Sequence, residues 1–164
     1  MQVASQVEKQ GYTNMVRIEK MLTFIQQMGY RKVGFAFCCG LKKEMEELHR
    51  IFSGRGFELH SINCKCGGLS KDNLGERELY WDDPTAQEPG CETMCNPIGQ
   101  AHYLAQCGTE FNIVVGLCVG HDSLFFQHSQ APVSVLAAKD WITGHQPLAP
   151  VYLLDGYYKR LLEK

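Results

Sequence analysis

The chain has eight cysteines among its 164 residues, and these thiols are its most conspicuous chemical resource. In a secreted protein an even cysteine count suggests disulfides, whereas in a reducing compartment it favours metal binding or thiol catalysis. One free cysteine is often no more than a small buried apolar residue, so the set carries more weight than any single member. The cysteines are Cys38, Cys39, Cys64, Cys66, Cys91, Cys95, Cys107 and Cys118.

The composition is that of an ordinary globular protein, with 45% hydrophobic and 21% charged residues. A net charge of −2 and a pI near 6.3 argue against a nucleic-acid or anionic-membrane partner. Residues 1–11 lack the basic flank and apolar core of a secretory signal, and no apolar run is long enough to span a bilayer. We therefore expect a cytoplasmic protein, in which thiols stay reduced.

Four apolar runs have the length and composition of buried strands, and between them apolar residues recur at the steps of three and four typical of helices. The predicted strands are residues 32–38, 57–64, 110–118 and 132–138. The predicted helices are residues 15–28, 41–52, 97–107, 122–126 and 152–164.

Strands that alternate with helices imply right-handed crossovers and a parallel sheet. The predicted fold is therefore α/β with three layers, in which a mostly parallel sheet of about four strands has helices on both faces. The length predicts one domain over residues 1–164. Residues 65–92 show no clear period, and a segment this long inside a compact domain is predicted to be a flap over the functional site.

Four of the cysteines share one edge of this predicted sheet. Cys38, Cys64 and Cys118 end the first three strands, and Cys95 stands just before a helix that begins at the same edge. Ligands of such sheets bind beyond the carboxyl ends of the strands. The sequence therefore predicts that these four sulfur atoms converge at one rim.

Thiolates select zinc, copper(I) or iron–sulfur clusters. Zinc sites usually take their ligands in pairs two to four residues apart, whereas these four cysteines are separated by 26, 31 and 23 residues. Dispersed single ligands suit a larger cluster held by several loops, which slightly favours an iron–sulfur cluster over a zinc ion.

Two residues also suggest thiol chemistry without a metal. Cys95 precedes a helix, whose N-terminus lowers the pKa of a thiol. His121 follows Cys118 by three residues and is a candidate metal ligand, hydrogen-bond donor to a ligand or proton carrier. The alternative to a metal centre is thus a thiol enzyme in which Cys95 or Cys118 is the nucleophile and His121 its base. The sequence has no phosphate-binding loop, dinucleotide fingerprint or nucleophile elbow.

Several segments together resemble a family of uncharacterised prokaryotic proteins, a domain of unknown function whose members are presumed metal-binding proteins. The resemblance covers roughly residues 12–152. It rests on RIEKMLTFIQQMGYRKVGFAFCCGL (17–41), NCKCGG (63–68), MCNPIGQA (94–101), NIVVGLCVGHDSLF (112–125) and APVSVLAAKD (131–140).

The resemblance implies a metal centre held by four cysteines. By motif, they are Cys38, Cys64, Cys95 and Cys118, the same four that the predicted sheet gathers. Many relatives begin with a further cysteine-rich segment, which this chain lacks before Cys38, so no second metal site is expected there. The remaining cysteines do not match the family's pattern and are interpreted as incidental: Cys39, Cys66, Cys91 and Cys107.

The sequence thus predicts a metal-binding protein with a cysteine-thiolate centre. Redox chemistry and sensing are the two roles considered for this centre. The predicted cofactor is an iron–sulfur cluster or a zinc ion, and the metal-free thiol enzyme remains the alternative. The predicted ligands are Cys38, Cys64, Cys95, Cys118 and His121.

Overall fold

A parallel four-stranded sheet forms the centre of the computed structural model, which describes residues 1–74 and 93–163. The strand order is β2-β1-β3-β4, and every neighbouring pair is parallel. The predicted α/β class is therefore confirmed. The strands are β1 (Lys32–Phe37), β2 (Glu58–Asn63), β3 (Phe111–Val115) and β4 (Val133–Ala137).

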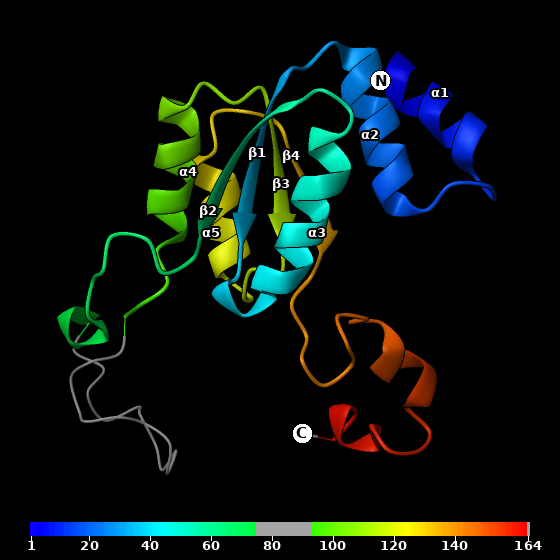
Figure 1. Cartoon of the computed structure of the whole chain (residues 1–164). Coiled ribbons are helices and arrows are strands. Elements are labelled where there is room, and N and C mark those ends of the chain that lie inside the picture. The colour runs from blue at the N-terminus through cyan, green and yellow to red at the C-terminus, as the bar shows by residue number, and fades with distance from the viewer. Residues whose placement is uncertain (75–92, 164) are drawn as a thin grey trace.

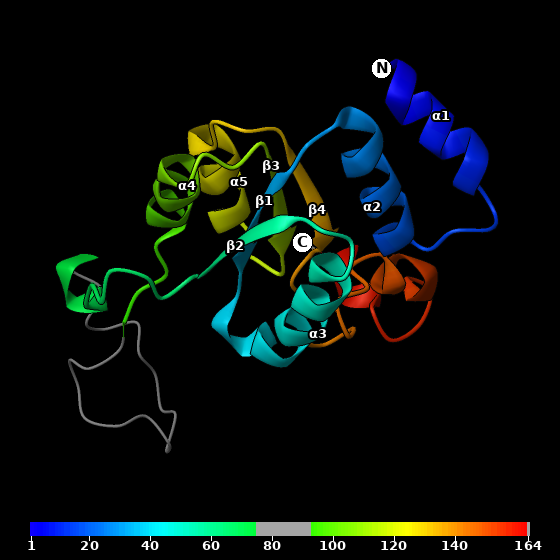
Figure 2. The same ribbon diagram turned by 45° about the horizontal axis from the view of Figure 1, so that its top comes forward.

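Helices lie on both faces of the sheet, which confirms the three-layer architecture (Figure 1). In the view of Figure 2, α4 and α5 lie on one side of the strands and α2 and α3 on the other, while α1 packs outside α2. None of the helices in the described ranges combines the length and apolarity that a bilayer-spanning helix needs. The helices are α1 (Gln2–Gly11), α2 (Arg17–Met28), α3 (Lys42–Ser53), α4 (Pro97–Gln106) and α5 (His121–His128).

The sequence patterns explain where these elements begin and end. All five residues of β3 are buried, as a strand covered on both faces requires. Helix α2 ends at Gly29, which adopts the left-handed conformation favoured by glycine after a helix. Asn96 caps α4, because its side-chain oxygen accepts a hydrogen bond from the Gly99 N–H at 2.8 Å. The end of α2 and the start of α4 agree with the sequence predictions.

The core lies between the sheet and each helical layer. Phe35 of β1 meets Phe52 of α3 edge to face at 5.1 Å, and both side chains are fully buried. On the opposite face, Leu104 of α4 and Phe125 of α5 are equally buried. Each such side chain contributes about 2 kcal/mol by leaving water, so the carboxyl edge rests on a well-packed base.

The C-terminal segment differs from its prediction. Instead of one helix over residues 152–164, the chain forms two short 3-10 turns at Ala149–Leu153 and Lys159–Leu161. Its aromatic residues are not buried, since Tyr152 is 76% exposed, so no core contact sustains a longer helix.

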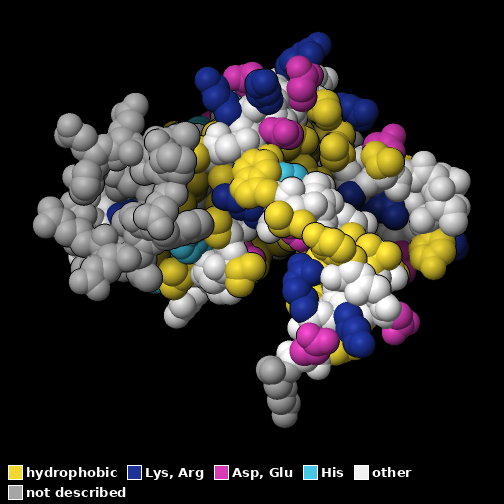
Figure 3. Space-filling model, turned by 90° about the horizontal axis from the view of Figure 1, so that it is seen from below, with side chains coloured by type: hydrophobic (Ala, Val, Ile, Leu, Met, Phe, Trp, Pro, Cys, Tyr) yellow, Lys and Arg dark blue, Asp and Glu magenta, His cyan; other side chains and the backbone are white. Residues whose placement is uncertain are grey.

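Figure 3 views the molecule from below, the side toward which the strands run in Figure 1. It shows hydrophobic side chains gathered beside lysines and arginines.

The predicted flap falls mostly on residues that the structure does not describe. Within its first part, a turn follows Cys64 and leads to a short 3-10 helix at Lys71–Leu74. Ser70 pairs with Thr93 in an isolated antiparallel bridge. Residues 75–92, including Cys91, lie outside the described ranges, so the flap stays a prediction.

The order of the strands creates a switch point between β1 and β3. The chain leaves β1 toward α3 on one face of the sheet, whereas it leaves β3 toward α5 on the other (Figure 2). Ligands of open α/β sheets bind in the crevice that opens where neighbouring strands diverge in this way. Cys38 follows β1 and Cys118 follows β3, so the two cysteines flank that crevice.

Candidate metal centre

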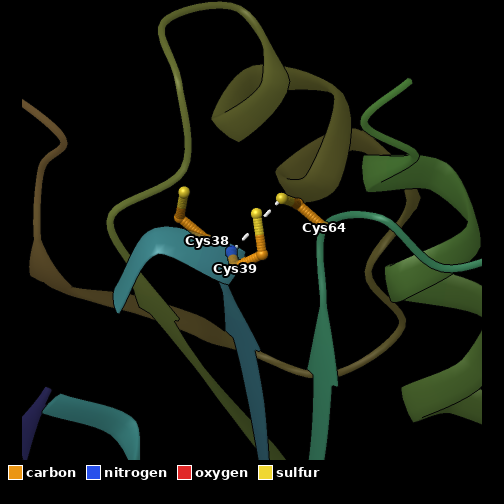
Figure 4. A group of neighbouring side chains, drawn as sticks. All are labelled: Cys38, Cys39 and Cys64. Atoms are coloured by element: carbon orange, nitrogen blue, oxygen red, sulfur yellow. Dashed lines mark hydrogen bonds between the residues drawn. The ribbon is translucent and has the colours of Figure 1, made fainter. Parts of the chain in front are cut away.

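Three sulfur atoms lie close together where β1 and β2 end. The Sγ atoms of Cys38, Cys39 and Cys64 are all within 4.8 Å of one another, and Figure 4 shows Cys39 between the other two. Tetrahedral ligation at metal–sulfur distances of 2.3 Å separates sulfurs by about 3.8 Å. These three thiols can therefore hold a metal ion after small movements of their side chains.

One pocket at the same edge is lined by all five residues that the sequence proposed as ligands. They share it with the apolar side chain of Leu117, the start of α4 and the amide of Gln100. The lining residues are Cys38, Cys64, Cys95, Pro97, Gln100, Leu117, Cys118 and His121.

Backbone hydrogen bonds tie these segments to one another. The N–H of Cys38 donates to the carbonyl of Val115 at 3.1 Å, which joins the turn after β1 to the end of β3. The N–H of Asn96 donates to the carbonyl of Cys64 at 2.7 Å and thereby holds Cys95 beside β2. Strands that end together thus bring together residues distant in the sequence.

The segment before Cys118 depends on a glycine. Strand β3 ends at Val115, earlier than the sequence predicted, and Gly116 turns the chain with a φ of 68°. A Cβ at Gly116 would lie 2.2 Å from a methyl carbon of Leu41. Only glycine accommodates both the turn and this close approach, so Cys118 reaches the pocket from a loop rather than from the strand end.

A hydrogen bond between Cys64 and Cys95 shifts the pKa values of both thiols. The Cys64 thiol donates a hydrogen bond to the Cys95 sulfur, and the positive charge of Lys65 also favours a thiolate there, so the pKa of Cys95 falls to about 7 despite its partial burial. The same hydrogen bond and burial raise the pKa of Cys64. The ammonium of Lys65 also donates to the carbonyl of Thr93. The sequence predicted a lowered pKa at Cys95, but its main cause is the Cys64 hydrogen bond.

Lys139 is a residue of this centre that the sequence analysis missed. Its Nζ donates to the Sγ atoms of Cys38 at 3.0 Å and of Cys118 at 3.3 Å. Partial burial opposes the charge, but the hydrogen bonds to the two sulfurs outweigh it and raise the pKa of the ammonium. The available signal was positional, since Lys139 comes two residues after β4 and therefore at the same edge of the sheet.

His121 begins α5 and lines the pocket. Burial and the charge of Lys139 lower its pKa, and the carboxylate of Asp122 only partly opposes them. The imidazole is therefore neutral near pH 7, which is the form that ligates metals.

Gln100 clamps the ends of two strands from the first turns of α4. Its fully buried amide donates to the carbonyls of Phe37 at 3.3 Å and Ile62 at 2.9 Å, just before Cys38 and Cys64. Its Oε1 has no hydrogen-bond partner within the described part of the chain. Gln100 thus fixes the spacing of two thiols and leaves one acceptor unused at the pocket.

The cysteines outside the predicted four fall into different places. Cys39, interpreted as incidental, lies in the group of three, because the 3-10 turn after Cys38 brings its N–H to 3.4 Å from the Cys64 sulfur. Cys66 donates its thiol to the carbonyl of Asn96 at 3.5 Å. Cys107 stands at the opposite end of α4 from Cys95. The interpretation of Cys39 as incidental is therefore corrected, because its sulfur lies with those of two predicted ligands.

The fold and the site together define a class, a parallel α/β protein with a cluster of cysteines at the carboxyl edge of its sheet. The chain belongs to the family described as "Protein of unknown function (DUF1847)", which matches residues 1–136. It is also 38% identical over 162 residues to an uncharacterised protein of Methanocaldococcus jannaschii, an alignment that covers 99% of this chain and 79% of that protein. The resemblance to an uncharacterised family is therefore confirmed, and the matched range, residues 1–136, spans the positions of all five predicted ligands.

Proposed function

We propose that this protein holds a metal centre in the thiolates of Cys38, Cys64, Cys95 and Cys118, with His121 as a further ligand. The observation that carries the proposal is the shared pocket, in which side chains from four separate segments meet. Several soft sulfur donors in one pocket suit zinc, copper(I) or iron–sulfur clusters. They do not suit hard cations such as Ca²⁺ and Mg²⁺, which take oxygen ligands.

The spread of the sulfurs favours an iron–sulfur cluster over a single zinc ion. The group of three thiols within 4.8 Å of one another does not include Cys118, whose Sγ accepts a hydrogen bond from the same Lys139 ammonium as the Sγ of Cys38. A cluster of several atoms occupies more space than one ion and is held by thiolates that stand further apart. We infer a role in electron transfer or in sensing, the two uses to which such clusters are suited.

A metal-free thiol enzyme is the second candidate, because a pKa of about 7 makes Cys95 partly thiolate at neutral pH. The groups that lower this pKa are the Cys64 thiol and Lys65, so His121 is not needed as an activating base. Cysteines that bind a metal together also lie close enough for one thiol to lower the pKa of another. The lowered pKa of Cys95 beside Cys64 therefore favours the metal centre over the thiol enzyme.

Purification without oxygen, followed by visible absorption and by metal and sulfide analysis, tests the proposal. A brown protein with iron and acid-labile sulfide would support the cluster. A colourless protein with stoichiometric zinc would replace the cluster by a zinc ion and retain the thiolate site. A folded protein free of metal, which takes up neither iron with sulfide nor zinc, would overturn the proposal in favour of the thiol enzyme.

A further inference from the structure

The Lys139 ammonium lies within hydrogen-bond distance of two thiols. One ammonium reaches the sulfurs of Cys38 and Cys118, which flank the switch point of the sheet. The same nitrogen lies over the Trp141 ring, 5.5 Å from its centre, where the aromatic face also attracts the charge. The side chain is half-buried, which strengthens its electrostatic effect on the two sulfurs.

Two features of the chain aim Lys139 at the pocket. Strand β4 carries one extra residue relative to β3, since Val114 pairs with Val135 but Val115 pairs with Ala137. Such a bulge redirects the side chains that follow it. The strand therefore delivers Lys139 toward the thiols rather than continuing its earlier alternation.

Trp141 then fixes the segment against the turn after β1. A Cβ at Gly40 would lie 2.8 Å from a carbon of the Trp141 ring, so glycine is needed for the indole to lie there. The side chain of Asp140 accepts the N–H groups of Ile142 and Thr143 and closes the turn beyond the lysine. Lys139 is thus held between the end of β4 and the turn that Asp140 closes.

We propose, resting on the cluster proposed above, that Lys139 is a positioning residue that raises the reduction potential of the centre by donating N–H···S hydrogen bonds to Cys38 and Cys118. One-electron reduction adds one negative charge to a thiolate-bound cluster, and the electron comes from a one-electron donor. A fixed ammonium beside two of the sulfurs stabilises the more negative state. Net charge and hydrogen bonds to sulfur are the levers by which proteins set such potentials.

Redox titration of the anaerobically purified protein with dithionite, followed by visible absorption, tests this role. Lys139→Met removes the charge and the donors while keeping the length of the side chain. We expect the reduction equilibrium to shift at least tenfold toward the oxidised form, about 59 mV for one electron. Lys139→Arg should retain most of the wild-type potential. Lys43→Met, which removes an exposed charge from the first turn of α3, is the matched control and should shift the equilibrium less than threefold.

The outcomes separate the two proposals. A Lys139→Met protein that holds its cluster at the wild-type potential overturns the inference and leaves the cluster in place. A wild-type protein that binds zinc overturns it as well, whereas one that binds no metal overturns the proposed function itself. If Lys139→Met fails to assemble the cluster, Lys139→Gln, which keeps an N–H donor without the charge, is titrated instead. Loss of the cluster in both variants with the fold intact would assign Lys139 to assembly and overturn its role in the potential.

Discussion

The two edges of the sheet are built on different principles. At the amino edge, the carboxylate of Glu110 accepts the backbone N–H groups of Arg31 at 2.6 Å and Lys32 at 2.9 Å. At the carboxyl edge, the sulfurs of Cys38, Cys39 and Cys64 lie within 4.8 Å of one another, and the Gln100 Oε1 has no partner within the described residues. The first edge pairs an acceptor with the donors that surround it, whereas the second gathers several thiols, of which the Lys139 ammonium pairs with two.

This difference indicates which edge has its polar groups paired within the protein and which edge is suited to bind a ligand. Groups that pair with their neighbours stabilise a fold and need nothing further. Neighbouring thiols of one kind cannot all ionise at little cost, because each thiolate raises the pKa of the next. A bound metal removes that conflict, since it neutralises several thiolates at once. Changes at the carboxyl edge should therefore alter ligand content, and changes at the amino edge should alter stability alone.

The largest expected effect is on metal content, and it contrasts the two ends of α4. Cys95→Ser should lower the metal-to-protein ratio by about tenfold or more, because a serine oxygen is a poor ligand for soft metals. The helix should remain folded, since Asn96 still caps it. Metal analysis and far-ultraviolet circular dichroism of the purified variant measure the two properties.

Cys107→Ser, at the opposite end of α4, is the matched control. It should leave the metal ratio unchanged, since Cys107 does not line the pocket. If Cys107→Ser empties the site while Cys95→Ser leaves it filled, the proposed set of ligands is wrong and the contrast between the edges is lost.

The second effect concerns the clamp that spaces the thiols. Gln100→Leu removes the donors to the buried carbonyls of Phe37 and Ile62 at similar side-chain volume. The free energy of unfolding should fall by about 1–3 kcal/mol, the cost of leaving buried acceptors without donors. Urea titration of the metal-free protein measures it.

Gln106→Leu serves as the comparison, because Gln106 is an exposed residue of the same helix. It should change the free energy of unfolding by less than about 0.5 kcal/mol. Equal effects of the two substitutions would mean that the clamp contributes nothing and that the strand ends are spaced by the sheet alone.

The sequence predicted the four strands and the helices α2 to α5, but not helix α1 and not every group at the rim. Apolar runs and helical periods are local signals, and the rule that parallel strands end at one edge carried Cys38, Cys64 and Cys118 to their places. Lys139 escaped notice because its direction depends on the extra residue in β4. Contacts made across the fold have no local signature.

Cys39 and the C-terminal segment show the same limit. The direction of Cys39 is decided by a three-residue 3-10 turn, which no apolar period reveals. The predicted helix over residues 152–164 has the right composition, but its apolar side chains find no core to pack against, as the exposure of Tyr157 shows. The predicted topology places residues at the correct edge of the sheet. The direction and burial of a side chain depend on neighbours that the sequence does not place.

The third effect compares thiols within the carboxyl edge. In metal-free protein at pH 7, Cys95 should react with iodoacetamide about fivefold faster than an ordinary thiol, since its greater ionisation outweighs its lower nucleophilicity. The pKa values of Cys39 and Cys66 are raised, first of all by burial, so both should react more slowly. Peptide mass spectrometry across a pH series should show a midpoint near the Cys95 pKa of about 7, and bound metal should suppress the labelling. Fastest labelling at Cys39 would contradict the assignment.

The smallest effect belongs to the amino edge and concerns acid. The backbone N–H groups of Lys32 and Arg31 lower the pKa of Glu110 in the folded protein below its ordinary value of 4.5. A carboxyl group with a lowered folded pKa contributes stability that is present above its unfolded pKa and is lost as the pH falls through the folded value. Glu110→Gln should therefore be less stable than the wild type at pH 7, and the gap should close below about pH 4. Thermal unfolding at pH 7 and pH 3 measures the gap, with Glu8→Gln on α1 as the control. A stability difference between the two proteins that stays constant with pH would mean that the charge of Glu110 does not contribute to stability. A change in metal content in Glu110→Gln would contradict the distinction between the two edges.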